Sequence, residues 1–147
     1  MKRHEALVPL SRDHHEALIL SQLLKKNAPV YKGLPETVEG KVNFATSFYE
    51  KELKGHFATE EEVFRLVKNS HPEEIEKIVI ELTGEHRSLE KMFTEIGIKE
   101  NPIDMMDQLG ELLNSHIRKE ERVLFPLLQE HCSEEMLEKI SQLTTHT

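Results

Sequence analysis

Two histidine–glutamate pairs with a four-residue spacing are the most chemically suggestive feature of the sequence. His116 and Glu120 fall within HIRKEERVLFP, and His56 and Glu60 fall within HFATEEEVFRLV. Residues four apart on a helix differ by only about 40° around its axis, so the two side chains of a pair can point at one position. Imidazole nitrogen and carboxylate oxygen both bind divalent transition metals. The spacing therefore suits the binding of a metal ion.

Both pairs lie on the hydrophobic side of their predicted helices. On a helical projection, the apolar residues around His116 centre at roughly 35° from its direction, which is within a core-facing stripe. These apolar residues are Leu109, Leu112, Leu113, Val123, Leu124 and Leu127. Around His56 and Glu60 the corresponding residues are Tyr49, Leu53, Val63 and Val67. We therefore expect all four polar side chains of the two pairs in the interior.

Two buried glutamates need compensating positive charge. A carboxylate buried without a partner costs several kcal/mol or takes up a proton. No lysine or arginine is apparent on either stripe to neutralise Glu60 or Glu120. A pair of bound dications would stabilise both carboxylates and would also explain the interior histidines.

Two further histidines complete the predicted site. His86 lies on a hydrophobic stripe, whereas Glu90, four residues later, falls roughly 80° from the middle of that stripe and is left out of the ligand set. In RDHHEAL, His14 and His15 are about 100° apart on a helix, so only one of them can face inward. Apolar residues follow at +3, +6 and +10 from both His14 and His86, which favours His14 over His15. The candidate metal ligands are His14, His56, Glu60, His86, His116 and Glu120.

Spacing alone is a weak signal. With nine histidines in 147 residues, roughly 1.5 His-x-x-x-Glu pairs are expected by chance. Four are present, of which His131 with Glu135 straddles an expected helix break and is treated as accidental. The prediction rests on the combination of spacing and hydrophobic surroundings. The remaining histidines lack such surroundings and are expected at the surface: His4, His71, His131 and His146.

The elements that position these residues are all predicted to be helices. Apolar residues recur at three- and four-residue intervals, and no segment alternates long enough to suggest a strand. The predicted helices run from Pro9 to about Lys26, from Pro35 to about Asn69, from Pro72 to Gly97, and from Asn101 to at least Phe125. Four long helices with short connections predict an all-α, up-down antiparallel four-helix bundle that forms one domain over residues 1–147.

Specific residues mark the helix ends. Pro35 and Pro72 suit first-turn positions, and Asn101 suits an N-cap with Pro102 behind it. Pro126 lacks a backbone N–H and its ring crowds the preceding turn, so we expect a kink or an end there. Ser133 then caps a short closing helix.

Composition narrows the possible environments and partners. A net charge of −8 with interleaved acids and bases gives no sign of nucleic-acid binding. The single cysteine, Cys132, cannot form an internal disulfide. The first residues contain too short an apolar run for a signal peptide or a membrane span. We therefore expect a soluble cytoplasmic protein without a nucleic-acid or membrane partner.

The order His, His-x-x-x-Glu, His, His-x-x-x-Glu, with EERVLFP after His116, resembles the hemerythrin-like (HHE cation-binding) family. The resemblance extends from about Pro9 to Gln129. It implies a non-haem di-iron centre in which Glu60 and Glu120 bridge the ions and the four histidines are terminal ligands. Oxygen-carrying members have an additional histidine on the third helix, where this chain has Glu90. That difference argues against reversible oxygen carriage.

Three functions are compatible with such a site. The first is a di-iron protein that binds or senses a diatomic ligand such as oxygen or nitric oxide, or that protects against oxidative or nitrosative stress. The second is an enzyme, either a nitric-oxide or peroxide reductase or an iron–sulfur repair protein. The third is a structural zinc-binding or metal-free interaction module. A set of nitrogen and oxygen ligands without a thiolate is compatible with the two iron ions that the resemblance implies, with zinc or manganese as alternatives.

Overall fold

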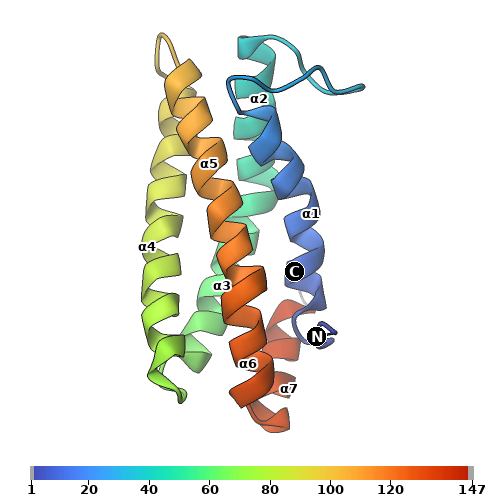
Figure 1. Cartoon of the computed structure of the whole chain (residues 1–147), viewed down its shortest axis with the longest axis vertical. Coiled ribbons are helices and arrows are strands. Elements are labelled where there is room, and N and C mark those ends of the chain that lie inside the picture. Colours follow the sequence, from blue (N-terminus) through green and yellow to red (C-terminus); the bar gives the residue numbers. More distant parts are fainter. Residues whose placement is uncertain (1, 146–147) are drawn as a thin grey trace.

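The computed structural model describes residues 2–145, in which every regular element is helical, so the all-α prediction is confirmed. Four long helical columns run beside one another along the longest axis (Figure 1). The columns are α1 (Val8–Leu23); α2 (Val38–Phe48) with the π-helical turn η1 (Tyr49–Leu53) and α3 (Lys54–Val67); α4 (Glu73–Ile96); and α5 (Ile103–Lys119) with the π-helical turn η2 (Glu120–Leu124) and α6 (Phe125–His131). The short helix α7 (Glu134–Thr144) closes the chain and packs against α3.

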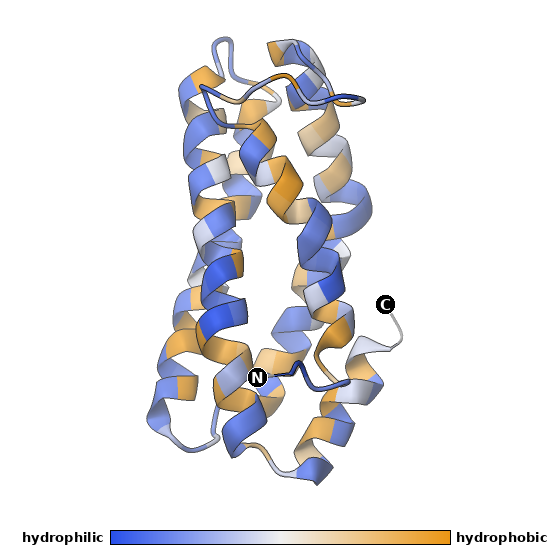
Figure 2. Ribbon diagram, turned by 45° about the vertical axis from the view of Figure 1, so that its right-hand side comes forward, coloured by the Kyte–Doolittle hydropathy of each residue, from blue (hydrophilic) through white to orange (hydrophobic). Residues whose placement is uncertain are grey.

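The columns follow one another around a central axis. Consecutive columns run in opposite directions (Figure 1). Helix α1 packs against α3 and α5, and α4 packs against the same two helices, so each column has two neighbours. Hydrophobic and hydrophilic residues alternate along every column, as the colouring in Figure 2 shows, and the buried residues recur mostly every three or four positions. Within residues 2–145, no helix is both long enough and apolar enough to span a bilayer.

Two predicted helix starts differ from the structure by two residues or more, and Pro72 is the N-cap of α4 instead of its first residue. The second column begins at Val38 rather than at Pro35, because the Thr37 side chain accepts a hydrogen bond from the Gly40 backbone at 3.0 Å and caps the helix there. The fourth column begins at Ile103 without a side-chain cap, so the predicted cap at Asn101 is wrong. The Ser133 cap is confirmed, because its hydroxyl accepts a hydrogen bond from Met136 N at 3.1 Å.

The sequence predicted a kink or an end at Pro126, and in the structure the helix does not end there. It continues through α6 to His131, and the irregularity is the π-helical turn η2 immediately before the proline. In this turn the Phe125 N–H donates to the Glu120 carbonyl five residues earlier. The wider turn shifts the hydrogen-bond register, so the chain accommodates the proline without leaving the helix.

The hydrophobic core consists of two separate clusters along the bundle axis. One includes Leu20, Phe93 and Leu113, and the other includes Leu10 and Leu124. In α1, His14 lies between residues of the two clusters, and His86 has the same position in α4. Two hydrophobic layers therefore enclose a polar layer in the middle of the molecule.

Candidate metal centre

The structure brings all six predicted ligands together in this polar layer. Their side-chain nitrogen and oxygen atoms form two groups of four, in each of which the atoms lie within 4.8 Å of one another. The groups are His14, His56, Glu60 and Glu120, and Glu60, His86, His116 and Glu120. His56 is the most exposed of the six at 5%, and both glutamates are at 0%. His15 is exposed, so the register argument placed the correct histidine of the adjacent pair inside.

The imidazole Nε2 atoms point at the two shared carboxylates. Nε2 of His56 lies 3.1 Å from Glu60, and Nε2 of His86 lies 3.0 Å from the other oxygen of the same carboxylate. Nε2 of His116 lies 3.3 Å from Glu120. Nε2 of His14 lies between the carboxylates, 3.4 Å from Glu60 and 3.2 Å from Glu120. Both glutamates therefore belong to both groups, as the bridging role implied by the family resemblance would require.

A closed ring of four carboxylates holds the opposite nitrogen of every imidazole. Each helix contributes one acid to the histidine of the next helix around the axis. The pairs are Asp13 with Nδ1 of His56 (3.0 Å), Glu61 with Nδ1 of His86 (2.9 Å), Glu85 with Nδ1 of His116 (2.8 Å) and Glu121 with Nδ1 of His14 (2.6 Å). Because an ionised carboxylate can only accept, Nδ1 donates in each of these pairs, which leaves Nε2 as the nitrogen that would bind a metal once it is deprotonated.

The sequence places these acids directly beside the predicted ligands. Asp13 and Glu85 each precede a ligand histidine by one residue, and Glu61 and Glu121 each follow a ligand glutamate by one residue. One residue along a helix is a rotation of about 100°, which turns a side chain from the bundle axis toward the neighbouring helix. Our sequence analysis missed these four acids, although the repeated adjacency of acid and ligand was a usable signal.

Three of the four acids are also held by a cation. Glu61 pairs with Arg87, Glu85 pairs with Lys119, and Glu121 pairs with Arg3. Within residues 2–145, Asp13 makes no ion pair with a lysine or an arginine, and its side chain is 49% exposed. The Asp13–His56 pair is therefore the least supported link of the ring.

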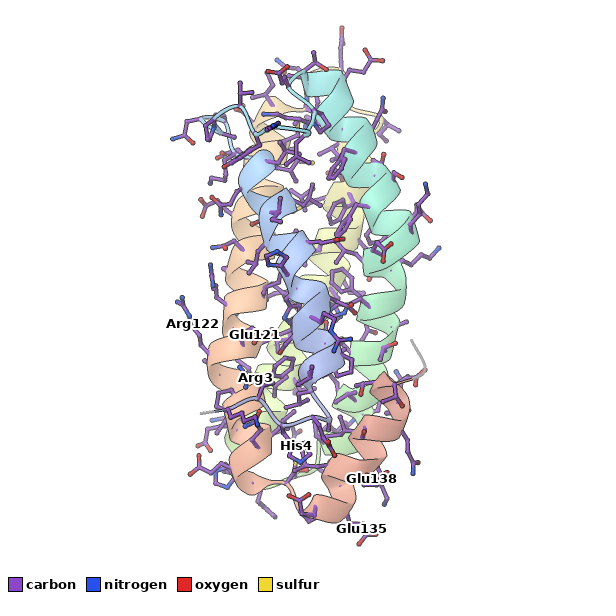
Figure 3. The ribbon with its side chains drawn as sticks, turned by 90° about the vertical axis from the view of Figure 1, so that its right-hand side faces the viewer. Arg3, His4, Glu121, Arg122, Glu135 and Glu138 are labelled. Atoms are coloured by element: carbon purple, nitrogen blue, oxygen red, sulfur yellow. The ribbon has the colours of Figure 1, made fainter. Side chains whose placement is uncertain are left out.

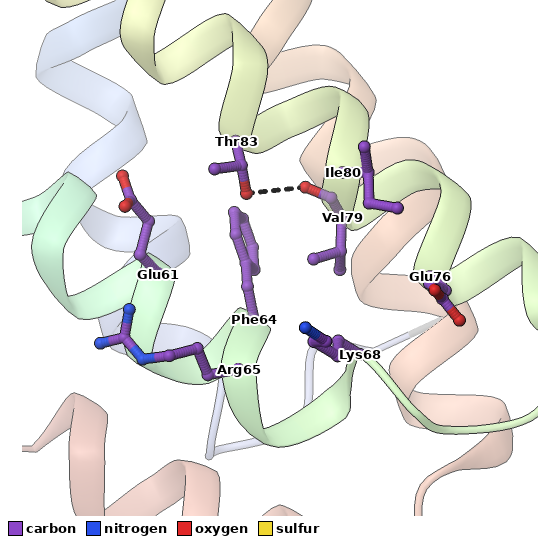
Figure 4. Close-up of a pocket in the computed structure, with 8 residues that line it drawn as sticks. All are labelled: Glu61, Phe64, Arg65, Lys68, Glu76, Val79, Ile80 and Thr83. Atoms are coloured by element: carbon purple, nitrogen blue, oxygen red, sulfur yellow. Dashed lines mark hydrogen bonds between the residues drawn. The ribbon is translucent and has the colours of Figure 1, made fainter.

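Surface pockets lie on two sides of the centre. One of about 360 Å³ is lined by Asp13, His56 and Thr59, among others, so it reaches a predicted ligand. Another of about 310 Å³ lies between α3 and α4 (Figure 4). Its lining includes Glu61 and Phe64 but none of the predicted ligands. The Phe64 ring stacks on His86 with ring centroids 5.8 Å apart and separates that pocket from the centre.

The buried charges shift one another's ionisation. Burial alone would lower the pKa of His56, but the charges of Glu60 and the hydrogen bond to Asp13 raise it to about 9. Burial alone would raise the pKa of Glu60, yet the charge of His56 and the surrounding hydrogen bonds hold it well below its usual value. The pKa of Glu120 is raised, first by burial and then by the charge of Glu60. The protein by itself therefore stabilises one of the two carboxylate charges and not the other.

Buried polar atoms without hydrogen-bond partners indicate that the six predicted ligands fit a metal. Among the described residues, eight buried side-chain nitrogen or oxygen atoms lack a hydrogen-bond partner, and six of them belong to the centre. These six are His14 Nε2, His56 Nε2, His116 Nε2, Glu60 Oε2 and both carboxylate oxygens of Glu120. Buried polar groups are normally satisfied, and all six atoms, once unprotonated, can donate an electron pair to a metal in the same space.

The comparison with known proteins agrees with this geometry. The family model described as Hemerythrin HHE cation binding domain matches residues 6–128. The chain belongs to this hemerythrin family. No curated protein and no solved structure matches it. The matched range covers all six predicted ligands of this hemerythrin chain, and it confirms the family resemblance inferred from the order of histidines and glutamates.

The other candidate residues lie away from the hemerythrin centre. Glu90 belongs to neither group of four, and its carboxylate lies 2.7 Å from Arg87. His71 and His131 are exposed as predicted. His4 is partly exposed, and its Nδ1 accepts a hydrogen bond from Ala6 N at 3.0 Å. His146 lies outside the described residues.

Proposed function

We propose that the chain is an up-down antiparallel four-helix bundle that holds two iron ions and binds a small ligand, such as oxygen, nitric oxide or peroxide, at that centre. The observation that carries the proposal is the pair of carboxylates, Glu60 and Glu120, each at 0% exposure and each shared by both groups of four residues. They would bridge the ions, and one pair of imidazoles would complete each half: His14 with His56, and His86 with His116. The ring of acids would orient all four imidazoles.

The chemistry of the donors supports iron. Four imidazole nitrogens and two carboxylates without a thiolate suit iron, manganese or zinc. The family assignment favours a cation but does not name it. Bound iron would supply redox chemistry and affinity for diatomic ligands. The protein residues would hold the ions, orient the imidazoles and exclude bulk water.

Glu90 supports ligand sensing or stress protection rather than oxygen carriage. This side chain pairs with Arg87 and stands apart from the centre. Each half of the site therefore has the same ligand set, two imidazoles and two shared carboxylates. With so few protein donors for two ions, each half would retain room for an exogenous ligand.

Metal content and absorption spectra test the proposal. Protein purified without added chelator is analysed for iron, zinc and manganese, and iron-loaded protein is examined in the near ultraviolet after exposure to air. We expect two iron ions per chain and absorption bands typical of a di-ferric centre. His14→Ala should lose these bands and the matched variant His15→Ala should keep them, because only His14 faces the centre.

Other outcomes would select other functions. Zinc without spectral bands would contradict the iron proposal and favour a structural metal. Sustained consumption of nitric oxide or peroxide in the presence of a reductant would show an enzyme instead of a binding protein. Equal loss of bands in the His14 and His15 variants would refute the assignment of ligands.

A further inference from the structure

The first described residues form a strap across the end of the fourth column. This N-terminal strap, residues 2–4, includes Arg3 and His4 (Figure 3) and is hydrogen-bonded to Gln129 of α6. The Gln129 side-chain oxygen accepts hydrogen bonds from His4 N at 2.9 Å and from Arg3 Nη1 at 3.2 Å, and its amide donates to the Lys2 carbonyl at 2.9 Å. The strap and Gln129 both lie just outside the family match at residues 6–128.

Arg3 satisfies a backbone carbonyl that the π-helical turn leaves open. In η2 the Phe125 N–H bonds to the Glu120 carbonyl, so it does not serve Glu121. The next nitrogen in the π register belongs to Pro126, which carries no hydrogen. Arg3 Nη2 donates to the Glu121 carbonyl at 3.0 Å and to its Oε1 at 3.1 Å. The guanidinium thus binds both the backbone and the side chain of one residue.

Glu121 connects Arg3 to His14, a predicted ligand of the metal centre. Its second oxygen, Oε2, lies 2.6 Å from Nδ1 of His14 and accepts a hydrogen bond from Ser11 at 2.8 Å. Both oxygens of the carboxylate are therefore held. A second route runs through Phe125. The Arg3 guanidinium lies 5.3 Å from the centre of that ring, and the ring stacks on the His14 imidazole with centroids 5.9 Å apart and an interplanar angle of 9°.

We propose that Arg3 is a positioning residue for the metal centre. It fixes the carboxylate of Glu121 and the ring of Phe125, and through them it sets the orientation of the His14 imidazole. The N-terminal strap is thus part of the site, although it lies outside the family match. The consequences for metal binding rest on the proposed function. The orientation of His14 does not, because all of its contacts are within the protein.

The test compares Arg3→Gln with Arg122→Gln. Arg122 is an exposed arginine of the same π-helical turn, and it makes no ion pair with the rest of the described chain. Both variants remove one positive charge close to the centre. The first readout is the Nδ1–H resonance of His14 in nitrogen-15 NMR spectra of metal-free protein. The second is the rate at which a chelator removes zinc from zinc-loaded protein.

We expect Arg3→Gln to shift the His14 resonance and to speed the loss of one of the two ions. Direct partners of a ligand change metal affinity by roughly 10- to 100-fold, so a residue one step further out should change it by about threefold to tenfold. Arg122→Gln should leave both readouts unchanged. Gln129→Ala should reproduce part of the effect, and the double variant should resemble Arg3→Gln alone, because both changes release the same strap.

Two results would overturn the inference. One is a His14 resonance and a chelation rate that remain at wild-type values in Arg3→Gln while only the melting temperature falls, which would make Arg3 purely structural. The other is an equal response to Arg122→Gln, which would show a general effect of charge. If the wild-type protein binds no metal, the proposed function fails, and the His14 resonance still decides whether the strap positions the imidazole.

Discussion

Glu120 is the predicted ligand whose charge the protein itself supports least. Its side chain is at 0% exposure, and neither carboxylate oxygen has a hydrogen-bond partner among the described residues. Glu60 is equally buried, but its Oε1 is hydrogen-bonded to Nε2 of His86 at 3.0 Å. The pKa of Glu120 is accordingly raised, by burial and by the charge of Glu60, whereas the pKa of Glu60 is lowered against the effect of burial.

Two chemically identical substitutions should therefore have opposite effects on the metal-free protein. A buried polar group without a partner costs about 1–3 kcal/mol. The amide of Glu120→Gln is still a buried polar group without a partner, so the substitution removes only the extra cost of the charge, and we expect metal-free protein to gain about 1 kcal/mol. For a domain of this size, that gain corresponds to roughly 2–4 °C in melting temperature per kcal/mol. Glu60→Gln removes the partner of His86 and His56, and it should lower stability by about 1–3 kcal/mol.

The sign of the effect also fixes its dependence on pH. A folded-state pKa above the unfolded value means that ionised Glu120 destabilises the fold at higher pH, and that this penalty disappears as the pH falls and the group becomes protonated. The advantage of Glu120→Gln should therefore be largest near neutral pH. It should vanish below the usual value of 4.5, where wild-type Glu120 is neutral in both states.

Bound metal should reverse the ranking. A ligand that binds only the folded state stabilises it by about 2.7 kcal/mol at a 100-fold excess over its dissociation constant. Wild-type protein should gain this stability, and Glu120→Gln should gain less because one shared carboxylate is lost. Urea unfolding with chelator and with ferrous iron under anaerobic conditions measures both quantities. If Glu120→Gln and Glu60→Gln destabilise metal-free protein equally, the carboxylate is already satisfied by the protein, and the main argument for a metal is lost.

Three further predictions concern the surroundings of the centre. Metal binding should release protons, and its affinity should increase as the pH rises from neutrality to about 9. The reason is that the raised pKa keeps His56 protonated in metal-free protein, whereas an imidazole that binds a metal must be neutral. A metal affinity that calorimetry finds independent of pH would contradict this. Asp13→Asn should speed chelator removal of one ion by about 10-fold, the lower end of the range for direct partners, because no lysine or arginine within residues 2–145 pairs with Asp13; an equal change for both ions would contradict this. Gly110→Ala should destabilise the protein by about 1–3 kcal/mol, because the added Cβ would lie 2.5 Å from the Ser21 carbonyl oxygen. Gly84→Ala should be neutral or stabilising by up to about 1 kcal/mol, because no atom lies within 4 Å of the added Cβ. Urea unfolding of the two variants measures the difference.

Helical periodicity was sufficient to predict the inward-facing residues. The choice of His14 over His15 depended only on rotation around one helix axis, which the neighbouring apolar residues define. Helix ends depend on single hydrogen bonds instead. Thr37 was missed as a cap because Pro35 offered a competing signal two residues earlier. The π-helical turns were missed because the buried residues still recur every four positions through them, as from His116 through Glu120 to Leu124, and this spacing is also compatible with an α-helix.

Contacts between helices were harder to predict than the ligands. A ligand needs only to face the axis of the bundle, so the sequence around one helix is enough to identify it. An acid such as Glu85 must in addition meet the next helix at the height of its histidine, which depends on the relative shift of two columns. Local sequence could nominate the acids beside each ligand, but it could not assign their partners.

The same reasoning explains why Arg3 could not be found from spacing. Arg3 and Glu121 are separated by 118 residues, and no periodic pattern connects them. What connects them is the absence of an N–H at Pro126, which leaves a carbonyl open within an otherwise continuous helix. A proline in the column that carries His116 and Glu120 therefore creates a requirement for a donor from outside that column. The strap meets this requirement, and it thereby links the first described residues to the histidine that is bonded to Glu121.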